Sequence, residues 1–245
     1  MSLVFGIHAV TEALNARLVT RLIHVRGGGT RVDGLVARAH ELRLPIETVD
    51  KLAIEKMARG GVHQGVAAEL RRLPAYTLEE LVREADGPAL IVVLDSVEDP
   101  HNVGAILRSV DAAGASGLVR QARHAASLDG ATAKASSGAV SHVHIATVVN
   151  IARAIDDLKE LGVWTVGLDA AASDPYDAAD FAQPTALVVG AEGTGLRRLV
   201  RETCDRLVKI PMTGHVQSLN VSVAAGIVLF EAVRQRRLKG VGARF

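Results

Sequence analysis

The chain has 245 residues, of which 49% are apolar and 22% are charged, and its mean hydropathy is +0.23. This composition predicts one large or two modest folded domains and excludes a mainly disordered chain. The single cysteine, Cys204, excludes an intramolecular disulfide and a cysteine-rich zinc cluster, which favours a reducing, cytosolic setting. The apolar stretch 223–230 is far shorter than the ~20 residues that cross a bilayer, and the N-terminus lacks the features of a secretory signal. We therefore expect no membrane association.

The net charge of +1 hides an uneven distribution of charge along the chain. Residues 1–73 carry 11 basic and 7 acidic side chains, residues 74–196 carry 7 and 17, and residues 197–245 carry 10 and 3. Basic flanks around an acidic middle favour a polyanionic partner held by the two ends. Of the 28 basic residues, 22 are arginine, which suits bidentate phosphate contacts, although GC-rich codon usage would enrich arginine as well.

The first 70 residues alternate between helical and extended patterns. The expected elements are a helix over 6–16, a strand over 19–26, a helix over 31–43, a strand over 45–49, a helix over 50–59 capped by Asp50, and a strand over 65–70. We predict a small α/β domain over residues 1–71, followed by a linker over 72–88 that holds a short helix.

The second half begins with the apolar run ALIVVLD, residues 89–95, which is typical of a strand buried on both faces of a parallel sheet. Further strands are expected at 117–120, 143–148, 163–168, 186–189 and 206–210, and helices at 103–113, 150–161, 195–203 and 219–237. This alternation predicts a mostly parallel α/β domain over residues 89–245. In such sheets ligands bind beyond the carboxyl ends of the strands, so these ends are where chemistry is expected.

One polar cluster follows the strand that ends at residue 95. Asn102 stands where a helix N-cap belongs, Gly104 permits close backbone approach, and Arg108 follows on the same helix, near a ligand-binding edge. The alternative interpretation is a simple cap followed by a solvated surface charge.

A second cluster, VVGAEGTGL, places three glycines around Glu192 after a buried strand. The glycine order G-x-x-G-x-G differs from the dinucleotide fingerprint G-x-G-x-x-G, so this loop does not predict a nicotinamide or flavin site. The alternative role for Glu192 is an acid in the first turn of the next helix, where the helix dipole favours it.

A third cluster, in residues 210–237, places polar Ser218, Asn220 and Ser222 before a helix that is rich in small residues. Ser218 could serve only as the helix N-cap, and the basic residues at the end of this helix could serve only to oppose its dipole.

Taken together, the three clusters resemble motifs one to three of the SpoU/TrmH family of RNA ribose 2'-O-methyltransferases. The matching patterns are N-x-G-x-x-x-R, G-A-E-G and I-P-M…S-L-N-V-S-x-A. The phrases FGIHAVTEAL, GVHQGVAAE and KASSGAV are similar to the bacterial branch that methylates guanosine in 23S ribosomal RNA. The resemblance covers almost the whole chain in order.

The resemblance implies a methyltransferase domain with a deep trefoil knot, S-adenosylmethionine as cofactor, no metal, and a homodimer whose active sites are completed across the interface. It implies that the N-terminal domain is ribosomal-protein-like and binds RNA. It places the adenine and ribose of the cofactor against the backbone of Gly190, Ile210 and Leu219, with Met212 nearby. It places around the reacting groups the side chains of Asn102, Arg108, Glu192, Ser218 and Asn220.

The identity of the general base stays open at this point. The family proposal makes Arg108 the base, but a guanidinium with a pKa above ~12 is rarely neutral. Alternatively, Arg108 clamps the adjoining phosphate and polarises the hydroxyl, while Asn220 or Ser218 fixes the lone pair of that oxygen. Glu192 would orient Arg108 or complement the positive charge of the cofactor.

The amino-acid composition restricts how the protein can contact its substrate. Seven aromatic residues (one Trp, two Tyr and four Phe) leave little scope for base stacking, so shape and phosphate contacts are expected. Candidate phosphate contacts are Arg17, Arg21, Arg26, Arg31 and Arg123. Two alternatives remain beside 23S ribosomal RNA methylation: a relative acting on transfer RNA or on another ribosomal RNA site, and a noncatalytic RNA-binding protein. The pair His142 and His144, expected on one face of a strand, has no partner for a metal site.

Overall fold

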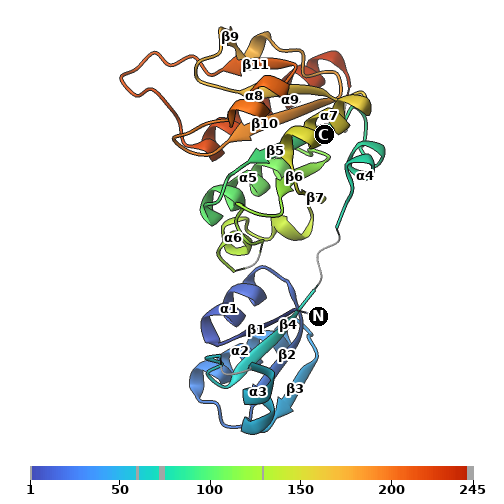
Figure 1. Cartoon of the computed structure of the whole chain (residues 1–245). Coiled ribbons are helices and arrows are strands. Elements are labelled where there is room, and N and C mark those ends of the chain that lie inside the picture. The colour runs from blue at the N-terminus through green and yellow to red at the C-terminus, as the bar shows by residue number, and fades with distance from the viewer. Residues whose placement is uncertain (1, 59–60, 72–74, 129, 242–245) are drawn as a thin grey trace. The chain divides into compact units, whose positions relative to one another are not determined.

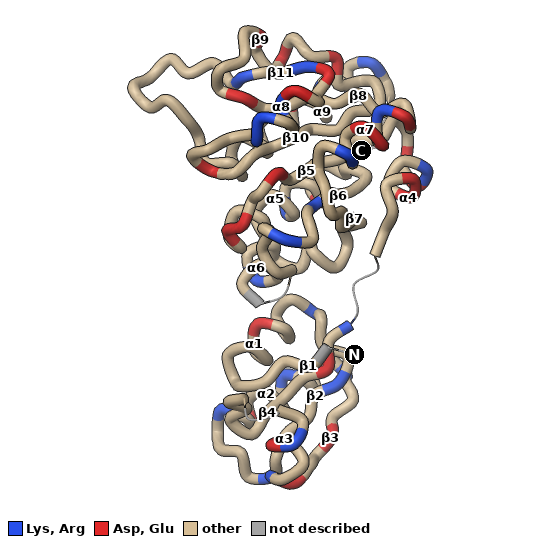
Figure 2. Tube along the Cα trace, in the orientation of Figure 1, with Lys and Arg blue, Asp and Glu red and all other residues tan. Residues whose placement is uncertain are grey.

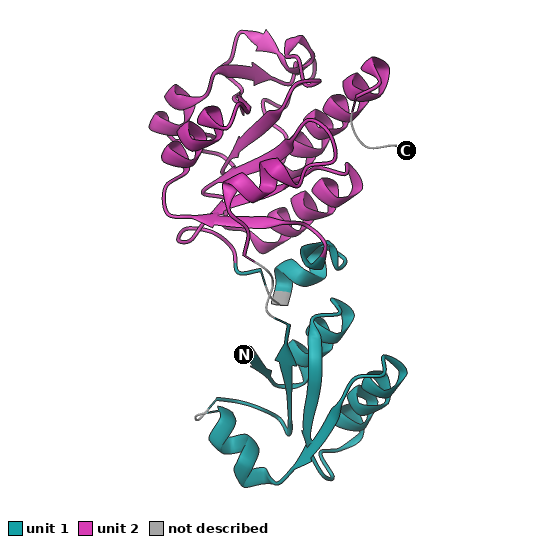
Figure 3. Cartoon of the chain, turned by 90° about the vertical axis from the view of Figure 1, so that its right-hand side faces the viewer, with its two compact units in different colours: residues 1–73, 127–141 teal, residues 74–126, 142–245 magenta. Residues whose placement is uncertain are grey.

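The computed structural model describes residues 2–58, 61–71, 75–128 and 130–241 (Figure 1). The chain forms two compact units, one of residues 1–73 and 127–141 and one of residues 74–126 and 142–245 (Figure 3). The domain limits predicted above stay a prediction.

The first unit is built on a four-stranded sheet with the order β1-β4-β2-β3. The strands are β1 (Ser2–Phe5), β2 (Val19–Val25), β3 (Ile46–Val49) and β4 (Val66–Leu70), and the helices are α1 (Ile7–Asn15), α2 (Thr30–Glu41) and α3 (Lys51–Ala58). β2 and β3 are parallel, whereas β4 runs antiparallel to β1 and β2. The main-chain N–H of Ala53 donates to Asp50 Oδ1 at 2.7 Å, which confirms the predicted cap. β1 was not expected, because four residues are too few to show an alternating pattern.

Segment 127–141 joins this first unit, although the sequence places it far from the N-terminus. It contains α6 (Gly130–Ala135) and the short 3₁₀ helix η1 (Ala139–Ser141), neither of which was expected from the sequence. α6 packs against α1, and Lys134 Nζ lies 3.2 Å from Glu12 Oε1. The phrase KASSGAV, quoted above only for its resemblance, therefore lies in a helical segment that contacts α1.

The second unit is built on a seven-stranded sheet with the order β7-β6-β5-β10-β8-β11-β9, in which every neighbouring pair is parallel. The strands are β5 (Leu90–Asp95), β6 (Gly117–Gln121), β7 (Ile145–Val148), β8 (Trp164–Leu168), β9 (Asp174–Pro175), β10 (Thr185–Gly190) and β11 (Arg206–Lys209). The helices are α4 (Leu78–Arg83), α5 (Pro100–Ala112), α7 (Ile151–Glu160), α8 (Arg198–Thr203) and α9 (Val221–Lys239), with a 3₁₀ turn η2 at Tyr176–Ala178. The α/β class and the parallel sheet predicted from the sequence are confirmed, while the knot stays a prediction.

Helices cover both faces of this sheet. The apolar run of β5 is buried at every position. Its residues Ile91 and Val93 pack in one core with α4, α7 and α8. On the other face, α5 packs against α9, and α9 packs against β10. A strand buried on both sides explains why β5 is apolar throughout rather than alternating.

Helix starts near the carboxyl edge differ from those predicted, and they matter for the site. α5 begins at Pro100, because Asp99 accepts from the N–H of His101 at 3.0 Å, so Asn102 is not the cap. α9 begins at Val221, because Asn220 rather than Ser218 is its cap. α8 begins three residues later than expected: Gly195 has φ +67° and the cap is Arg197.

Candidate functional site

A cavity of about 410 Å³ opens at the carboxyl edge of the seven-stranded sheet. It lies at the ends of β8, β10 and β11 and at the start of α9, and its lining residues are 168–171, 189–196, 201, 209, 210, 212, 217–219, 221 and 224. The last residues of β5 and β10, Asp95 and Gly190, are direct partners in the sheet. The cavity thus lies at the carboxyl ends of parallel strands, the edge at which sheets of this kind bind ligands.

The loop after β10 requires glycine at its first position. A Cβ on Gly190 would overlap the backbone of Gly195 and Leu196, because the loop folds back on the strand end. The N–H of Gly195 donates to the carbonyl of Ala191 at 2.9 Å and closes this turn. Glycine at this position therefore lets the loop fold back on the strand end, and the residues of this loop line the cavity.

A chain of side-chain hydrogen bonds joins the three sequence clusters. Asn220 Nδ2 donates to Asn102 Oδ1 at 2.9 Å, and Asn102 Nδ2 donates to Glu192 Oε2 at 3.0 Å. These partners are 118 and 90 residues apart in the sequence. Asn102 is buried, with 6% of its surface exposed. The structure thus brings together one residue from each predicted motif.

The direction of this chain follows from the cap of α9. Asn220 Oδ1 accepts from the N–H and the hydroxyl of Ser222 at 2.9 and 2.6 Å. With its oxygen engaged there, the amide of Asn220 presents NH₂ to Asn102, and Asn102 in turn presents NH₂ to Glu192. The Glu192 carboxylate is held at the cavity wall by this orientation. The alternative of Glu192 as a first-turn acid is wrong, because α8 starts only at Arg198.

The other predicted site residues divide into two groups. The four residues expected to hold the cofactor all line the cavity, as does Ser218: Gly190, Ile210, Met212 and Leu219. Arg108 lies on α5, six residues beyond Asn102, and is exposed. Within the described residues, Arg108, Asn102 and Asn220 lie outside the cavity lining.

Three charged residues of the cavity wall were missed. Asp169 Oδ2 lies 2.9 Å from Arg201 Nε, and its Oδ1 accepts from the N–H of Ala171 at 2.8 Å. Lys209 lines the cavity beside them. Asp169 directly follows the predicted strand 163–168, so its place at a carboxyl end was a signal that could have found it.

No group of three or more histidine, cysteine or acidic side chains that could hold a metal occurs in the part of the chain that the structure describes. His142 and His144 precede β7 rather than lying in a strand, and the ring of His144 stacks on Tyr76 with centroids 4.1 Å apart. Burial raises the pKa of the Cys204 thiol to about 12, so it is protonated at neutral pH. None of the described helices is long and apolar enough to cross a membrane.

The predicted phosphate contacts differ in their surroundings. Arg21 donates to Glu47 and Glu69 at 2.9 and 3.0 Å and so is bound within the sheet of the first unit. The other candidates are exposed: Arg17, Arg26, Arg31 and Arg123. Figure 2 shows basic positions on both units of the chain.

Comparisons with known proteins identify the family of the chain. Residues 89–230 match the SpoU rRNA Methylase family, and residues 3–76 match the family described as RNA 2'-O ribose methyltransferase substrate binding. The chain is 44% identical over 239 residues to the 23S rRNA (guanosine-2'-O-)-methyltransferase RlmB of Ralstonia nicotianae, covering 96% of each chain. It is 41% identical over 242 residues to RlmB of Pseudomonas putida, covering 96% of this chain and 97% of that one.

The chain is also similar to a solved structure that contains a bound cofactor. The SpoU methyltransferase AviRb from Streptomyces viridochromogenes, in complex with the cofactor AdoMet (S-adenosylmethionine), superposes with a TM-score of 0.68 at 29% identity. The match covers 96% of this chain and 90% of that chain. With a family model spanning more than half of its residues and relatives above 40% identity along nearly its full length, the chain belongs to the SpoU rRNA methylase family.

Proposed function

We propose that this protein transfers a methyl group from S-adenosylmethionine to the ribose 2'-hydroxyl of a guanosine in 23S ribosomal RNA. The observation that carries the proposal is the hydrogen-bonded chain Asn220–Asn102–Glu192 beside a glycine-walled cavity. Full-length relatives named for this reaction support the choice of substrate.

The cavity fits the proposed cofactor. The glycine loop that begins at Gly190 lines the cavity, and its main-chain groups would recognise an adenine edge and a ribose, while Ile210, Met212 and Leu219 supply apolar surface. The Glu192 carboxylate in the wall complements a positively charged ligand. When bound, S-adenosylmethionine supplies an electrophilic methyl group on a sulfonium centre.

The chain's own residues orient the attacking sugar. A guanidinium suits bidentate contacts with phosphate oxygens, so we assign Arg108 to the phosphate next to the reacting ribose, where it also polarises the 2'-hydroxyl. Ser218 and Asn220 position that hydroxyl, and Glu192 is kept in place by Asn102. Alignment of the reacting atoms within ~3–3.5 Å is the main contribution expected from these residues.

We infer that the active form is a homodimer in the cytoplasm. Val223 and Phe230 lie seven residues apart on α9, with exposed fractions of 51% and 49%, and residues at this spacing share one face of a helix. An exposed apolar face of this kind suits packing against a second copy. Residues 1–71 would bind the RNA, with exposed arginines as phosphate contacts.

The test is methyl transfer by the purified protein to 23S ribosomal RNA and to transfer RNA. We expect transfer to 23S ribosomal RNA, and Arg108→Ala should abolish it while leaving the calorimetric Kd for S-adenosylmethionine nearly unchanged. Arg153→Ala is the matched control, because Arg153 is an exposed arginine on α7, which packs on the opposite face of the sheet. Transfer to transfer RNA alone, or full turnover by Arg108→Ala, would contradict the proposal.

A further inference from the structure

A buried carboxylate lies under the glycine loop and belongs to none of the three motifs. Asp95 is the last residue of β5 and has no exposed surface. Arg197 donates two hydrogen bonds to it, from the main-chain N–H to Oδ2 at 2.8 Å and from Nε to Oδ1 at 2.6 Å, and its Nη2 forms an ion pair with the same Oδ1 at 2.5 Å. A buried carboxylate satisfied by one arginine in this way is a geometrically specific contact.

Arg197 ends the loop and is the N-cap of α8, which begins at Arg198. Its side chain makes no cap bond to α8, and its own N–H is directed to Asp95 instead. The side chain of Arg197 is about half exposed, and its Nε and Nη2 contact the carboxylate. The contact therefore fixes the backbone of Arg197 as well as its side chain.

Both ends of the loop are held by Asp95. Gly190, where the loop starts, is the partner of Asp95 in the sheet, and Arg197, where it ends, is bound by the carboxylate. The middle of the loop is held by the bond from Asn102, on the helix that follows β5, to Glu192. One strand and the helix after it thus restrain the loop at three points, and the loop between them lines the cavity.

We propose that Asp95 and Arg197 are a positioning pair that sets the shape of the glycine loop and thereby the affinity for S-adenosylmethionine. This inference rests on the proposed function. Neither residue needs to touch the cofactor: loss of the pair frees the end of the loop, and the main-chain groups between Gly190 and Leu196 shift relative to the ligand. Displacements of ~1 Å in a binding site reduce activity by as much as ~100-fold.

The principal test compares two adjacent arginines. Arg197→Met removes the guanidinium but keeps the main-chain N–H. Arg198→Met is the matched control, because the side chain of Arg198 is 82% exposed and forms an ion pair with Glu202 of the same helix. We expect Arg197→Met to raise the calorimetric Kd and the KM for S-adenosylmethionine roughly 10- to 100-fold. The KM for RNA should change little, and Arg198→Met should match wild type in every measurement.

A second pair of variants tests whether Asp95 and Arg197 act as a unit on cofactor binding. Asp95→Asn, and Asp95→Asn combined with Arg197→Met, should bind the cofactor no more weakly than Arg197→Met, since residues that act as a unit are not additive. A lowered Tm with an unchanged cofactor Kd in Arg197→Met would overturn the inference, as would equal losses in both arginine variants. Absence of cofactor binding by the wild type would instead refute the proposed function.

Discussion

The carboxyl edge and the amino edge of the seven-stranded sheet each contain a buried charged side chain, but the two side chains bind different kinds of group. At the carboxyl edge, Asp95 engages a single arginine, and the polar chain next to it ends at a carboxylate in the cavity wall. At the amino edge, a buried arginine, Arg236 of α9, bonds to backbone carbonyls that precede β5 and β10. At the carboxyl edge, the Glu192 carboxylate remains available to a ligand. At the amino edge, the Arg236 guanidinium and the carbonyls are hydrogen-bonded to each other.

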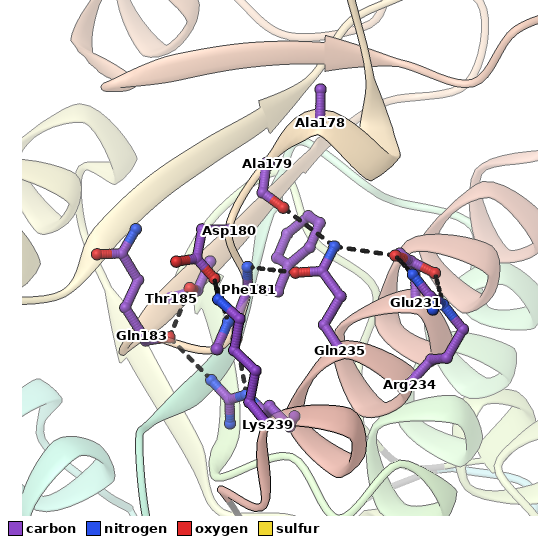
Figure 4. Close-up of polar contacts among 12 residues, drawn as sticks. Ala178, Ala179, Asp180, Phe181, Gln183, Thr185, Glu231, Arg234, Gln235 and Lys239 are labelled. Atoms are coloured by element: carbon purple, nitrogen blue, oxygen red, sulfur yellow. Dashed lines mark hydrogen bonds and ion pairs between the residues drawn. The ribbon is translucent and has the colours of Figure 1, made fainter.

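Backbone groups at the amino edge are hydrogen-bonded to side chains in the last turns of α9. Arg236 donates to the carbonyls of four residues that precede the strands: Pro88, Ala89, Phe181 and Gln183. Burial lowers the pKa of its guanidinium to about 10, so it is still charged at neutral pH. Figure 4 shows the adjoining contacts, in which Gln235 bonds to Phe181 and Ala179, and Lys239 bonds to Asp180.

This difference indicates where mutations affect function and where they affect stability. Of the carbonyls at the amino edge, those of Ala89 and Gln183 also accept from Thr185. Loss of the buried arginine therefore leaves the carbonyls of Pro88 and Phe181 without their side-chain donor and weakens the hydrogen bonding of the other two. Groups at the carboxyl edge are held through a loop that has to keep one shape, so a change there alters the cavity first. Three variants test this distinction, beginning with the largest expected effect.

The largest effect is expected for Gly190→Ala at the carboxyl edge. The added Cβ would overlap backbone atoms of Gly195 and Leu196, which cannot move aside as a flexible side chain can. The loop must open, and we expect S-adenosylmethionine binding to weaken by more than about 100-fold and methyl transfer to be lost. Calorimetry and a methyl-transfer assay measure these losses.

Two other glycines provide graded controls for this variant. Gly193→Ala adds a Cβ that meets nothing within 4 Å but at φ +83°, so only backbone strain of about 1–2 kcal/mol is expected. Gly214→Ala also meets nothing within 4 Å, and we expect wild-type binding. Equal losses in all three variants would mean that the close approach at Gly190 is not what shapes the cavity.

Much of this site could be predicted from the sequence, because short motifs and strand ends are local features. The apolar run 89–95 predicted the strand that β5 forms, and the three clusters were expected at one edge, where Asn102, Glu192 and Asn220 are found in contact. The family resemblance placed Gly190 against the cofactor, and Gly190 lines the cavity.

Other features depend on distant partners and leave no local signal. The Asp95–Arg197 contact joins residues 102 positions apart, and nothing in either neighbourhood identifies the other. The cap of α5 was assigned to Asn102 because asparagine and aspartate are equally good caps, and tertiary contacts directed Asn102 to Glu192 instead. Segment 127–141 joined the first unit through contacts with α1 that a linear pattern does not contain.

The intermediate effect is expected for Arg236→Met at the amino edge. The substitution keeps much of the apolar stem of a residue that is 8% exposed, but it removes the guanidinium that donates to the carbonyls of Pro88 and Phe181. We expect a loss of about 3 kcal/mol in the free energy of unfolding, measured in urea, with an unchanged cofactor Kd in the folded protein. Arg237→Met is the control, because Arg237 is exposed on the same helix. Weaker cofactor binding without loss of stability would remove the distinction between the two edges.

The smallest effect is expected for Asp205→Asn, at the amino end of β11. The pKa of this carboxyl group is lowered in the folded protein. Burial by itself would raise the pKa, but hydrogen bonds from the hydroxyl and N–H of Thr165, at 2.7 and 2.9 Å, and the nearby Lys159 have the larger, opposite effect. A carboxyl group whose pKa is lower in the folded state stabilises the fold above its unfolded pKa of about 3.9, and this contribution disappears as the pH falls through the folded pKa.

Asp205→Asn should therefore reduce the free energy of unfolding by about 1 kcal/mol at pH 7, and the difference from wild type should shrink below about pH 4. Urea unfolding across this pH range measures both values, and the cofactor Kd at pH 7 should not change. A gap that widens in acid would mean that the carboxylate is not stabilised by Thr165 and Lys159. A change in Kd would show that a contact at the amino edge reaches the cavity, and the separation of stability from binding between the two edges would then fail.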